Sequence, residues 1–268
     1  MRRFLVAGNW KMHGSQKMTV DLISGIAKSA LEKADNSDLG YDILVCPPAA
    51  YLSRAVTASK ESVLAESGQE VKVGAQNVSP FDEGAYTGEI SLPMLSDLEC
   101  QYVLLGHSER RHIFGESNES VAEKFAACAV SEDDIVPVLC VGETLPDREA
   151  GNTEKVISEQ IDAVLDIVGI AGFANAVVAY EPVWAIGTGV TATPEQAQEM
   201  HAFIRAKLAK LNAETAKAIQ ILYGGSVKPN NAEKLFAEPD IDGGLIGGAA
   251  LNVDSFVGIC EAARKLSN

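Results

Sequence analysis

Short apolar runs alternate with longer amphipathic stretches along the whole chain. The short runs have the length of strands and are bounded by polar or glycine-containing segments, so they predict β-strands. They are apolar at nearly every position rather than at every second one, which indicates a sheet covered on both faces. In chain order the predicted strands are Phe4–Gly8, Ile43–Cys46, Val71–Ala75, Tyr102–Leu105, Ile135–Cys140, Ala176–Tyr180, Ile219–Leu222 and Gly244–Ile246.

The longer stretches predict helices between the strands. Two of them open with capping signals: Ser117 or Asn118 at the start of one, and Thr193 as the cap with Pro194 at the first helical position of the other. The segments after the second and third strands carry a less clear helical pattern. The predicted helices are Lys17–Lys33, Ser117–Val130, Thr153–Val168, Pro194–Leu211, Asn230–Phe236 and Val253–Lys265.

The alternation of strands and helices predicts parallel strands joined by crossover helices. About eight such units in 268 residues match a single closed (β/α)8 barrel, with a doubly wound open sheet as the alternative. No linker or low-complexity segment divides the chain, so one domain over residues 1–268 is expected. The glycine-rich region Gly74–Thr87 is expected to form a long loop within that domain.

Charge and apolar run length argue against several classes of protein. The chain has 22 Lys and Arg against 37 Asp and Glu, a net charge of −15, and no basic stripe that would indicate nucleic-acid binding. The apolar run Phe4–Gly8 is shorter than the roughly 7–15 residues of a signal-peptide core, and no run reaches the ~18 residues of a membrane span. We therefore expect a cytoplasmic protein without nucleic-acid or membrane partners.

The cysteines and histidines form neither a metal-binding nor a disulfide pattern. The sequence has no CxxC or HExxH motif, and the spacing of His107 and His112 does not fit a metal site. His13 and His201 are predicted to lie on the surface. The residues predicted to act as small buried apolar groups are Cys46, Cys100, Cys128, Cys140 and Cys260.

Polar residues at the C-terminal ends of strands are the candidates for chemistry, because active sites of (β/α)8 barrels form there. Glu181 follows the sixth strand, and Pro182 stops that strand because it has no N–H to donate. A short apolar segment and then Gly187 and Gly189 follow, as in a hinged lid. A carboxylate under such a lid is expected to have a raised pKa and to act as a base, with a structural salt bridge as the alternative.

Two further strand ends carry an imidazole and an ammonium group. His107 follows the fourth strand and precedes a helix-compatible run, whose positive N-terminal end disfavours the imidazolium. A neutral imidazole that donates to a carbonyl oxygen is therefore predicted, with a core histidine as the alternative. Lys11 follows the first strand and is a candidate anchor for a substrate anion, with an ordinary surface lysine as the alternative.

The last two strands end in glycine pairs, Gly224-Gly225 before Ser226 and Gly247-Gly248. Glycine lets backbone N–H groups approach an anion closely, and barrels of this kind often bind phosphate at these two loops. Tight turns are the alternative. The segment Gly187–Ala192 matches the dinucleotide pattern GxGxxG/A, but it does not directly follow a strand. The motif also requires an acidic residue about 20 positions later, at the end of a second strand, whereas the region around Lys207 is predicted to be the interior of a helix. No dinucleotide cofactor is therefore predicted.

In their order and spacing these segments resemble the triosephosphate isomerase family. The resemblance implies a TIM barrel that interconverts dihydroxyacetone phosphate and D-glyceraldehyde 3-phosphate through an enediolate, in glycolysis and gluconeogenesis. It also implies that no metal or organic cofactor takes part. The matching segments are residues 8–11, 74–77, 84–91, 106–111, 140–143, 179–189, 223–226 and 247–248.

The resemblance also implies roles for individual residues. Glu181 matches the catalytic base, His107 the electrophile and Lys11 the anion-binding lysine. Asn9 matches an oxygen-binding amide beside the lysine, and Glu109 an acidic residue that adjoins it. The phosphate-binding backbone positions are matched by Gly187, Ser226, Gly247 and Gly248.

The same resemblance implies a mobile lid over residues 182–191 and a homodimer in which Thr87 reaches into the partner's site. Other classes stay open on the residues alone. Another phosphate-handling barrel enzyme would share the late glycines but would not need both His107 and Glu181. A nucleotide-dependent oxidoreductase would use the Gly187 pattern, and a non-catalytic binding protein would lack one of the reacting groups.

Overall fold

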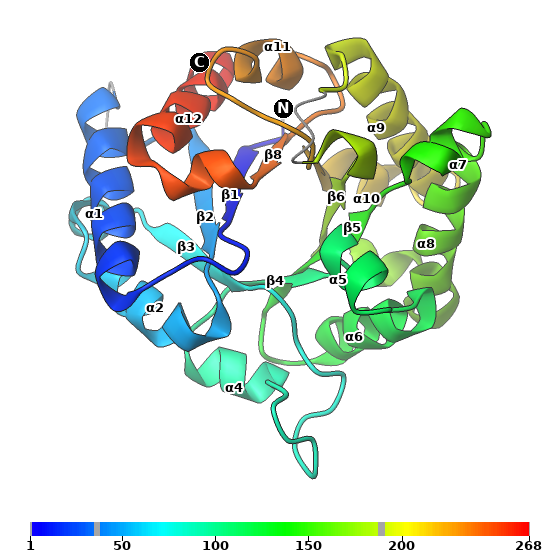
Figure 1. Ribbon diagram of the computed structural model, residues 1–268, viewed down its shortest axis with the longest axis horizontal. Coiled ribbons are helices and arrows are strands. Elements are labelled where there is room, and N and C mark those ends of the chain that lie inside the picture. Colours follow the sequence, from blue (N-terminus) through cyan, green and yellow to red (C-terminus); the bar gives the residue numbers. More distant parts are fainter. Residues whose placement is uncertain (1, 35–37, 187–190, 268) are drawn as a thin grey trace.

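Parallel strands form a closed barrel at the centre of the molecule, and helices surround it (Figure 1). The computed structural model describes residues 2–34, 38–186 and 191–267. Within these residues the strands follow one another around the barrel in sequence order, and the last pairs with the first, which confirms the (β/α)8 barrel over the open sheet. The strands are β1 (Phe4–Asn9), β2 (Tyr41–Cys46), β3 (Val71–Ala75), β4 (Tyr102–Leu105), β5 (Val136–Val141), β6 (Val177–Tyr180), β7 (Gln220–Tyr223) and β8 (Gly243–Ile246).

The helices begin and end within two residues of the predictions wherever the amphipathic pattern is clear. The α-helices are α1 (Gln16–Lys33), α2 (Leu52–Lys60), α3 (Val63–Glu66), α4 (Leu92–Asp97), α5 (Ser108–Ile113), α6 (Asn118–Val130), α7 (Leu145–Glu149), α8 (Thr153–Val168), α9 (Pro194–Ala209), α10 (Ala213–Ala218), α11 (Ala232–Phe236) and α12 (Val253–Ser267). Short 3-10 segments are η1 (Ala49–Tyr51), η2 (Ile170–Phe173), η3 (Val183–Ala185) and η4 (Gly248–Leu251). The predicted caps are confirmed, since Ser117 accepts a hydrogen bond at the start of α6 and Thr193 forms a capping box with Gln196 at α9.

Apolar side chains fill two layers, because successive residues of a strand point to opposite faces. In β1, Leu5 and Ala7 belong to the cluster inside the barrel, whereas Phe4 and Val6 belong to the cluster between strands and helices. Both layers are buried, which explains why the strands are apolar at nearly every position. The apolar interior leaves the strand ends as the place for polar chemistry.

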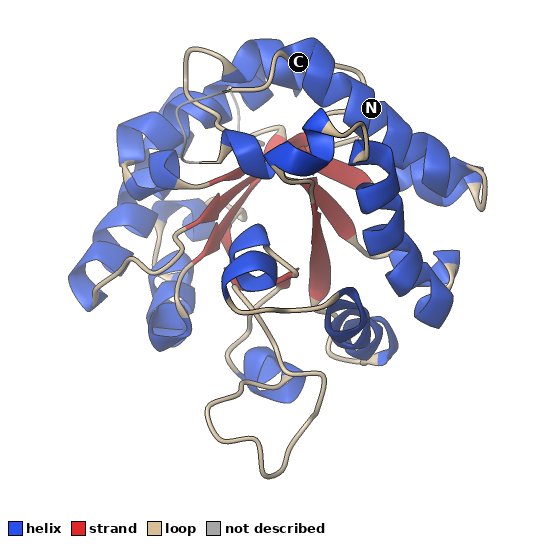
Figure 2. Ribbon diagram, turned by 45° about the vertical axis from the view of Figure 1, so that its right-hand side comes forward, coloured by secondary structure: helices blue, strands red, loops and turns tan. Residues whose placement is uncertain are grey.

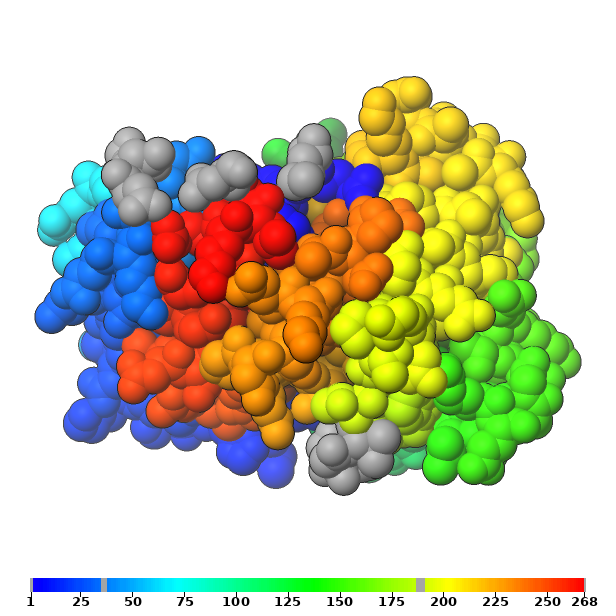
Figure 3. Space-filling model, turned by 90° about the horizontal axis from the view of Figure 1, so that it is seen from above, coloured from blue at the N-terminus to red at the C-terminus, as the bar shows by residue number. Residues whose placement is uncertain are grey.

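Elements from both ends of the described chain close the barrel. β1 lies between β2 and β8, and α12 contacts α1. Figure 3 shows the red C-terminal residues packed beside the blue N-terminal ones on the face in view. In the part of the chain that the structure describes, no helix is both long and apolar enough to cross a membrane.

The predicted burial of the cysteines and the predicted exposure of His13 are confirmed, whereas the predicted exposure of His201 is wrong. The five cysteines, all within the described ranges, are buried and unpaired, and His13 is exposed. His201 is instead fully buried on α9, where its Nδ1 lies 3.2 Å from the Asp240 carbonyl oxygen and its ring packs nearly perpendicular to the Tyr180 ring. The surface prediction fails because the Asp240 carbonyl oxygen pairs with one ring nitrogen inside the protein, while Nε2 is buried without a partner among the described residues. Burial lowers the pKa of His201 to about 3, so the ring is neutral.

The segment between β3 and α4 projects away from the barrel as the expected long loop (Figures 1 and 2). The prediction set its start at Gly74, but Gly74 and Ala75 still belong to β3. Within the loop Phe81 and Tyr86 are exposed, and their rings stack with centroids 4.2 Å apart. Exposed apolar side chains on a projecting loop are typical of an interaction surface.

Candidate active site

The candidate residues that lie at the ends of different strands line one cavity. Its volume is about 290 Å³, and it opens at the C-terminal end of the barrel. Of the predicted substrate-binding residues, Gly187 lies outside the described residues. Glu109 lines a neighbouring cavity of about 370 Å³, which shares Asn9, Lys11 and His107 with the first. The candidates that line the first cavity are Asn9, Lys11, His107, Glu181, Ser226, Gly247 and Gly248.

Glu181 follows β6 directly, and two glycines make room for it. Its backbone N donates to the Val141 carbonyl oxygen at 2.7 Å, which continues the pairing of β5 with β6. A Cβ atom on Gly142 would lie 1.8 Å from the carbonyl oxygen of Glu181, and one on Gly224 would lie 2.8 Å from its Cγ. Only glycine at both positions lets the neighbouring strand ends pack this closely against Glu181.

The Glu181 carboxylate is almost fully buried, with 2% of the residue exposed, and it has two hydrogen-bond donors. Oε1 lies 2.9 Å from His107 Nε2, and Oε2 accepts a hydrogen bond of 2.9 Å from the Ser108 backbone N–H. Burial raises the pKa of Glu181, but His107, the Ser108 N–H and Lys11 together lower it by more, so the net shift is downward. The predicted raised pKa is wrong for this arrangement, because the sequence does not reveal the donors that hold the carboxylate.

His107 caps the start of α5 with its own ring. Nδ1 accepts a hydrogen bond from the Glu109 backbone N–H at 3.2 Å, so this nitrogen needs a free lone pair, and the ring proton is assigned to Nε2. Burial lowers the pKa of His107, while the carboxylates of Glu181 and Glu109 raise it by more, and the net shift is upward. An imidazolium would have to give up the hydrogen bond at Nδ1. The geometry therefore favours a neutral ring that donates from Nε2.

Lys11 has an unusual backbone conformation that its neighbours maintain. Its φ is 51°, a left-handed value that costs a non-glycine residue about 1–3 kcal/mol. Its N–H donates to Asn9 Oδ1 at 2.9 Å, and its carbonyl oxygen accepts from Gln76 Nε2 at 2.8 Å. Side-chain to backbone bonds on both sides thus fix the turn that aims Lys11 along the cavity.

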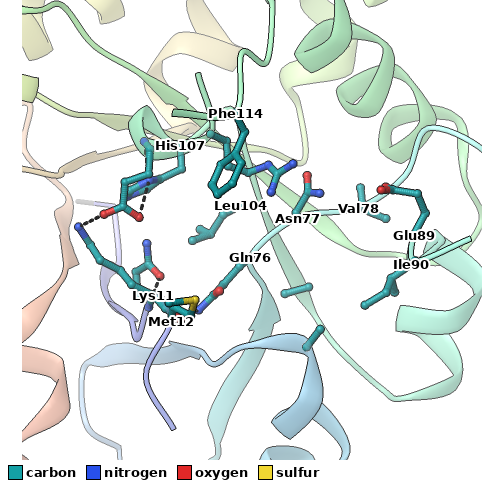
Figure 4. A pocket seen from close by; sticks show the side chains of 16 residues that line it. Lys11, Met12, Gln76, Asn77, Val78, Glu89, Ile90, Leu104, His107 and Phe114 are labelled. Atoms are coloured by element: carbon teal, nitrogen blue, oxygen red, sulfur yellow. Dashed lines mark hydrogen bonds and ion pairs between the residues drawn. The ribbon is translucent and has the colours of Figure 1, made fainter. Parts of the chain in front are cut away.

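The Lys11 ammonium group is paired and only partly exposed. Nζ lies 2.6 Å from Glu109 Oε1, and 26% of the lysine side chain is accessible. Figure 4 draws this ion pair as a dashed line from the labelled Lys11, beside the labelled His107. A lysine held in this way is not an ordinary surface lysine. The ion pair leaves a positive charge at the cavity wall in a fixed place.

The two glycine-containing loops form another part of the cavity wall. Gly247 adjoins Lys11, since a Cβ atom there would lie 3.5 Å from the lysine Cε. Gly248 starts η4, and Gly225 and Ser226 line the same cavity after β7. Backbone N–H groups of glycine loops beside a lysine can bind a phosphate group.

Three further residues shape this site, and no role was predicted for them from the sequence. Ser108 contributes a backbone N–H, which no residue type reveals. Gln76 directly follows β3, so the rule that identified Lys11 and His107 at strand ends also finds it. Glu143 is fully buried after β5 and accepts hydrogen bonds from Trp184 Nε1 at 2.8 Å and the Tyr180 hydroxyl at 3.1 Å. It anchors the first residues that follow the base.

Together, the closed barrel, the buried carboxylate, the imidazole and the lysine beside a glycine-lined wall define a (β/α)8-barrel enzyme that acts on a small phosphorylated compound by proton transfer. The family model for triosephosphate isomerase matches residues 4–263. The chain belongs to the triosephosphate isomerase family, which confirms the resemblance seen in the sequence.

Curated relatives are similar to this chain over nearly their whole length. A protein of Hydrogenovibrio crunogenus is 52% identical over 267 residues, which cover 99% of this chain and all of the relative. One of Dechloromonas aromatica is 54% identical over 264 residues, or 98% of this chain and all of the relative. One of Thiobacillus denitrificans is 54% identical over 265 residues, or 99% of this chain and all of the relative. All three are named triosephosphate isomerase.

Proposed function

We propose that this protein interconverts dihydroxyacetone phosphate and D-glyceraldehyde 3-phosphate through an enediolate, as an isomerase of glycolysis and gluconeogenesis. Membership of the triosephosphate isomerase family supports the reaction. The observation that carries the proposal is that Glu181, His107 and Lys11 line one cavity with the glycine loops. The reaction moves a proton between two adjacent carbons, and a base, an electrophile and an anion anchor are the groups that this requires.

In the proposed mechanism Glu181 removes a proton from the carbon next to the substrate carbonyl and returns it to the neighbouring carbon. His107 Nε2–H, Asn9 and Lys11 stabilise the negative charge on the enediolate oxygens. The resting carboxylate occupies the Nε2–H donor of His107, so the substrate oxygen takes over this donor when Glu181 turns to the substrate. Binding of the substrate oxygen to His107 Nε2–H therefore releases the Glu181 carboxylate from that donor.

The same exchange changes the basicity of Glu181. In the resting state the Ser108 N–H and His107 stabilise the ionised carboxylate and lower its pKa. Once the carboxylate leaves these donors, burial still disfavours its charge. The pKa of Glu181 therefore rises when substrate is bound, which strengthens the base at the moment it acts.

The phosphate group is proposed to bind near Lys11 at the backbone of Ser226, Gly247 and Gly248. These positions line the cavity, and the nearby ammonium group outweighs distant screened charges of a chain with net charge −15. Gly187, proposed for the same site, lies outside the described residues, as does part of the proposed lid over 182–191. A closed lid would exclude water and limit loss of phosphate from the enediolate.

A coupled assay tests the function most simply. The purified protein, without added metal or organic cofactor, is given dihydroxyacetone phosphate, and formation of glyceraldehyde 3-phosphate is followed with an auxiliary dehydrogenase. Formation of glyceraldehyde 3-phosphate is the expected result. Failure to convert dihydroxyacetone phosphate under these conditions would contradict the proposal.

A homodimer is proposed, in which the loop that carries Thr87 enters the partner's site. The loop projects from the barrel with Phe81 and Tyr86 exposed. The second cavity, which contains Lys11, has the exposed side chains of Met12 and Phe114 at its wall (Figure 4). A projecting loop and a partly apolar cavity of about 370 Å³ on one surface support reciprocal insertion. Light scattering during size exclusion should give twice the chain mass, and a monomer at micromolar concentration would contradict the proposal.

We further propose that residues 1–268 act as one catalytic domain in the cytoplasm. The family match over residues 4–263 and the pairing of β1 with β8 in one barrel support a single domain. The five unpaired thiols fit a reducing compartment. Limited proteolysis that released a stably folded fragment would contradict the single domain, and fractionation of cells would test the location.

A further inference from the structure

The last residue of β5 and the two residues after it form a shelf, residues 141–143, on which the base and the first residues of the proposed lid rest. The Glu181 backbone N–H donates to the Val141 carbonyl oxygen at 2.7 Å, and the Val183 N–H donates to the Glu143 carbonyl oxygen at 3.1 Å. The Glu143 side chain accepts the Trp184 indole N–H at 2.8 Å. The position of the shelf therefore sets the position of the chain from Glu181 to Trp184.

The middle residue of the shelf, Gly142, uses both of its backbone groups on one side chain of α8. Its N–H donates to Gln160 Oε1 at 2.8 Å, and its carbonyl oxygen accepts from Gln160 Nε2 at 3.0 Å. Gln160 is buried, with 7% exposed, on a helix face that is otherwise apolar at Ile157, Ile161 and Val164. A buried primary amide with both ends bonded to one residue fixes that residue in two directions.

The backbone of Gly142 packs directly against the backbone of Glu181, with no free space between them. A Cβ atom there would lie 1.8 Å from the Glu181 carbonyl oxygen, so the two backbones are in direct contact. Any shift of Gly142 toward β6 must move Glu181 as well. Misplacement of a catalytic group by about 1 Å can cost on the order of 10²-fold in rate.

We propose that Gln160 is a positioning residue that holds the shelf and thereby sets the place of Glu181 and the resting place of Trp184. The inference rests on the proposed isomerase function. Gln160 does not line the substrate cavity and acts only through Gly142. Without its amide, two backbone groups would be left buried and unpaired, and the shelf would move to find new partners.

The main test compares Gln160→Met, which has a similar length but no amide, with Val164→Ala on the same buried face of α8 as a matched control. Both variants should lose stability. Gln160→Met leaves the N–H and the carbonyl oxygen of Gly142 without hydrogen-bond partners, and Val164→Ala leaves a cavity. For Gln160→Met, kcat should fall by about 10- to 100-fold while KM changes by less than about threefold. For Val164→Ala, kcat should stay within about twofold.

A second readout follows the fate of the enediolate. If its C–O bond to phosphate breaks, the phosphate leaves with the electron pair, and a three-carbon dicarbonyl forms. If Trp184 is displaced, water should be excluded less completely from the bound enediolate. Gln160→Met should therefore release more inorganic phosphate per turnover than Val164→Ala. Equal kcat and equal phosphate release in the two variants would overturn the proposal. An unaltered protein without isomerase activity would instead refute the proposed function.

Gln160→Glu keeps the proposal testable if Gln160→Met does not fold. A protonated carboxyl accepts the Gly142 N–H and donates to its carbonyl oxygen, as the amide does, whereas the ionised form cannot donate. The ratio of the variant's kcat to that of the unaltered protein should therefore rise as the buffer is made mildly acidic. A ratio that stays constant with pH would contradict the proposal.

Discussion

The imidazole of His107 and the carboxylate of Glu181 are in direct contact, with Nε2 2.9 Å from Oε1. Each group comes from a different strand end, β4 and β6, and both are buried. Because Nδ1 already accepts the Glu109 N–H, Nε2 is the donor in this contact. The resting protein thus keeps its proposed base on the donor that its substrate needs, and several predictions depend on that relationship.

The pH profile should reveal the exchange of donors. The pKa of Glu181 in the free protein is lowered from its ordinary value of 4.5, so the ionised base persists to lower pH than an ordinary glutamate and is lost only as pH falls through the lowered pKa. In the substrate complex the donors are lost and the pKa rises. The acid limb of kcat should therefore lie at higher pH than that of kcat/KM, after correction for the phosphate ionisation near pH ~6. The opposite order of the two limbs would contradict the exchange.

Gly224 should tolerate no side chain. In Gly224→Ala the new Cβ would lie 2.8 Å from Glu181 Cγ and 3.1 Å from the Tyr180 carbonyl oxygen, so the base must move. We expect kcat to fall by about 10²-fold, measured in the coupled assay. Gly68→Ala is the control, because Gly68 has positive φ but no neighbour within 4 Å. It should cost about 1 kcal/mol of stability and leave kcat unchanged, whereas equal kcat values for the two variants would rule out the steric account.

Lys11→Met should impair both binding and rate. The ammonium group lies beside the cavity, 2.6 Å from Glu109, and is proposed to bind the phosphate and stabilise the enediolate. Loss of one such charged donor should lower kcat by at least about 10²-fold and raise KM clearly. Lys28→Met is the control on an exposed site of α1, with 71% of its side chain accessible, and should behave as the unaltered protein. A KM near the original value for Lys11→Met would show that Lys11 does not bind the substrate phosphate.

The stability of the protein should fall in mild acid because of His201. Its folded pKa of about 3 lies below the ordinary value of 6.5, so within that window the unfolded chain binds a proton that the folded chain does not. The free energy of unfolding should therefore fall as pH falls from 6.5 toward 3, by up to about 1.4 kcal/mol per pH unit from this residue.

His201→Gln keeps a donor for the Asp240 carbonyl oxygen and should show a smaller pH slope in urea unfolding at one fixed protein concentration. His13→Gln, at an exposed position, serves as the control and should keep the original slope. If both variants retain the slope of the unaltered protein, His201 does not cause the acid sensitivity.

The sequence predicts the barrel well because both faces of the strands are covered, so the strands are apolar at nearly every position. Lys11, His107 and Glu181 are predictable for a related reason, since polar residues directly after buried strands meet at one end of a barrel. What could not be predicted depends on backbone groups and distances. The Ser108 N–H and the amide of Gln160 have no signature in residue type, and the lowered pKa of Glu181 follows from contacts of 2.9 Å. His201 was misplaced because its partner is a backbone carbonyl.

The turnover of Glu181→Gln shows directly whether Glu181 is the catalytic base. The amide keeps the shape of the side chain and can still accept the Ser108 N–H, but it cannot take a proton from carbon. If Glu181 is the base, kcat should fall by at least about 10²–10⁴-fold, with an unchanged circular dichroism spectrum and a KM of the same order. A kcat close to that of the unaltered protein would contradict the account.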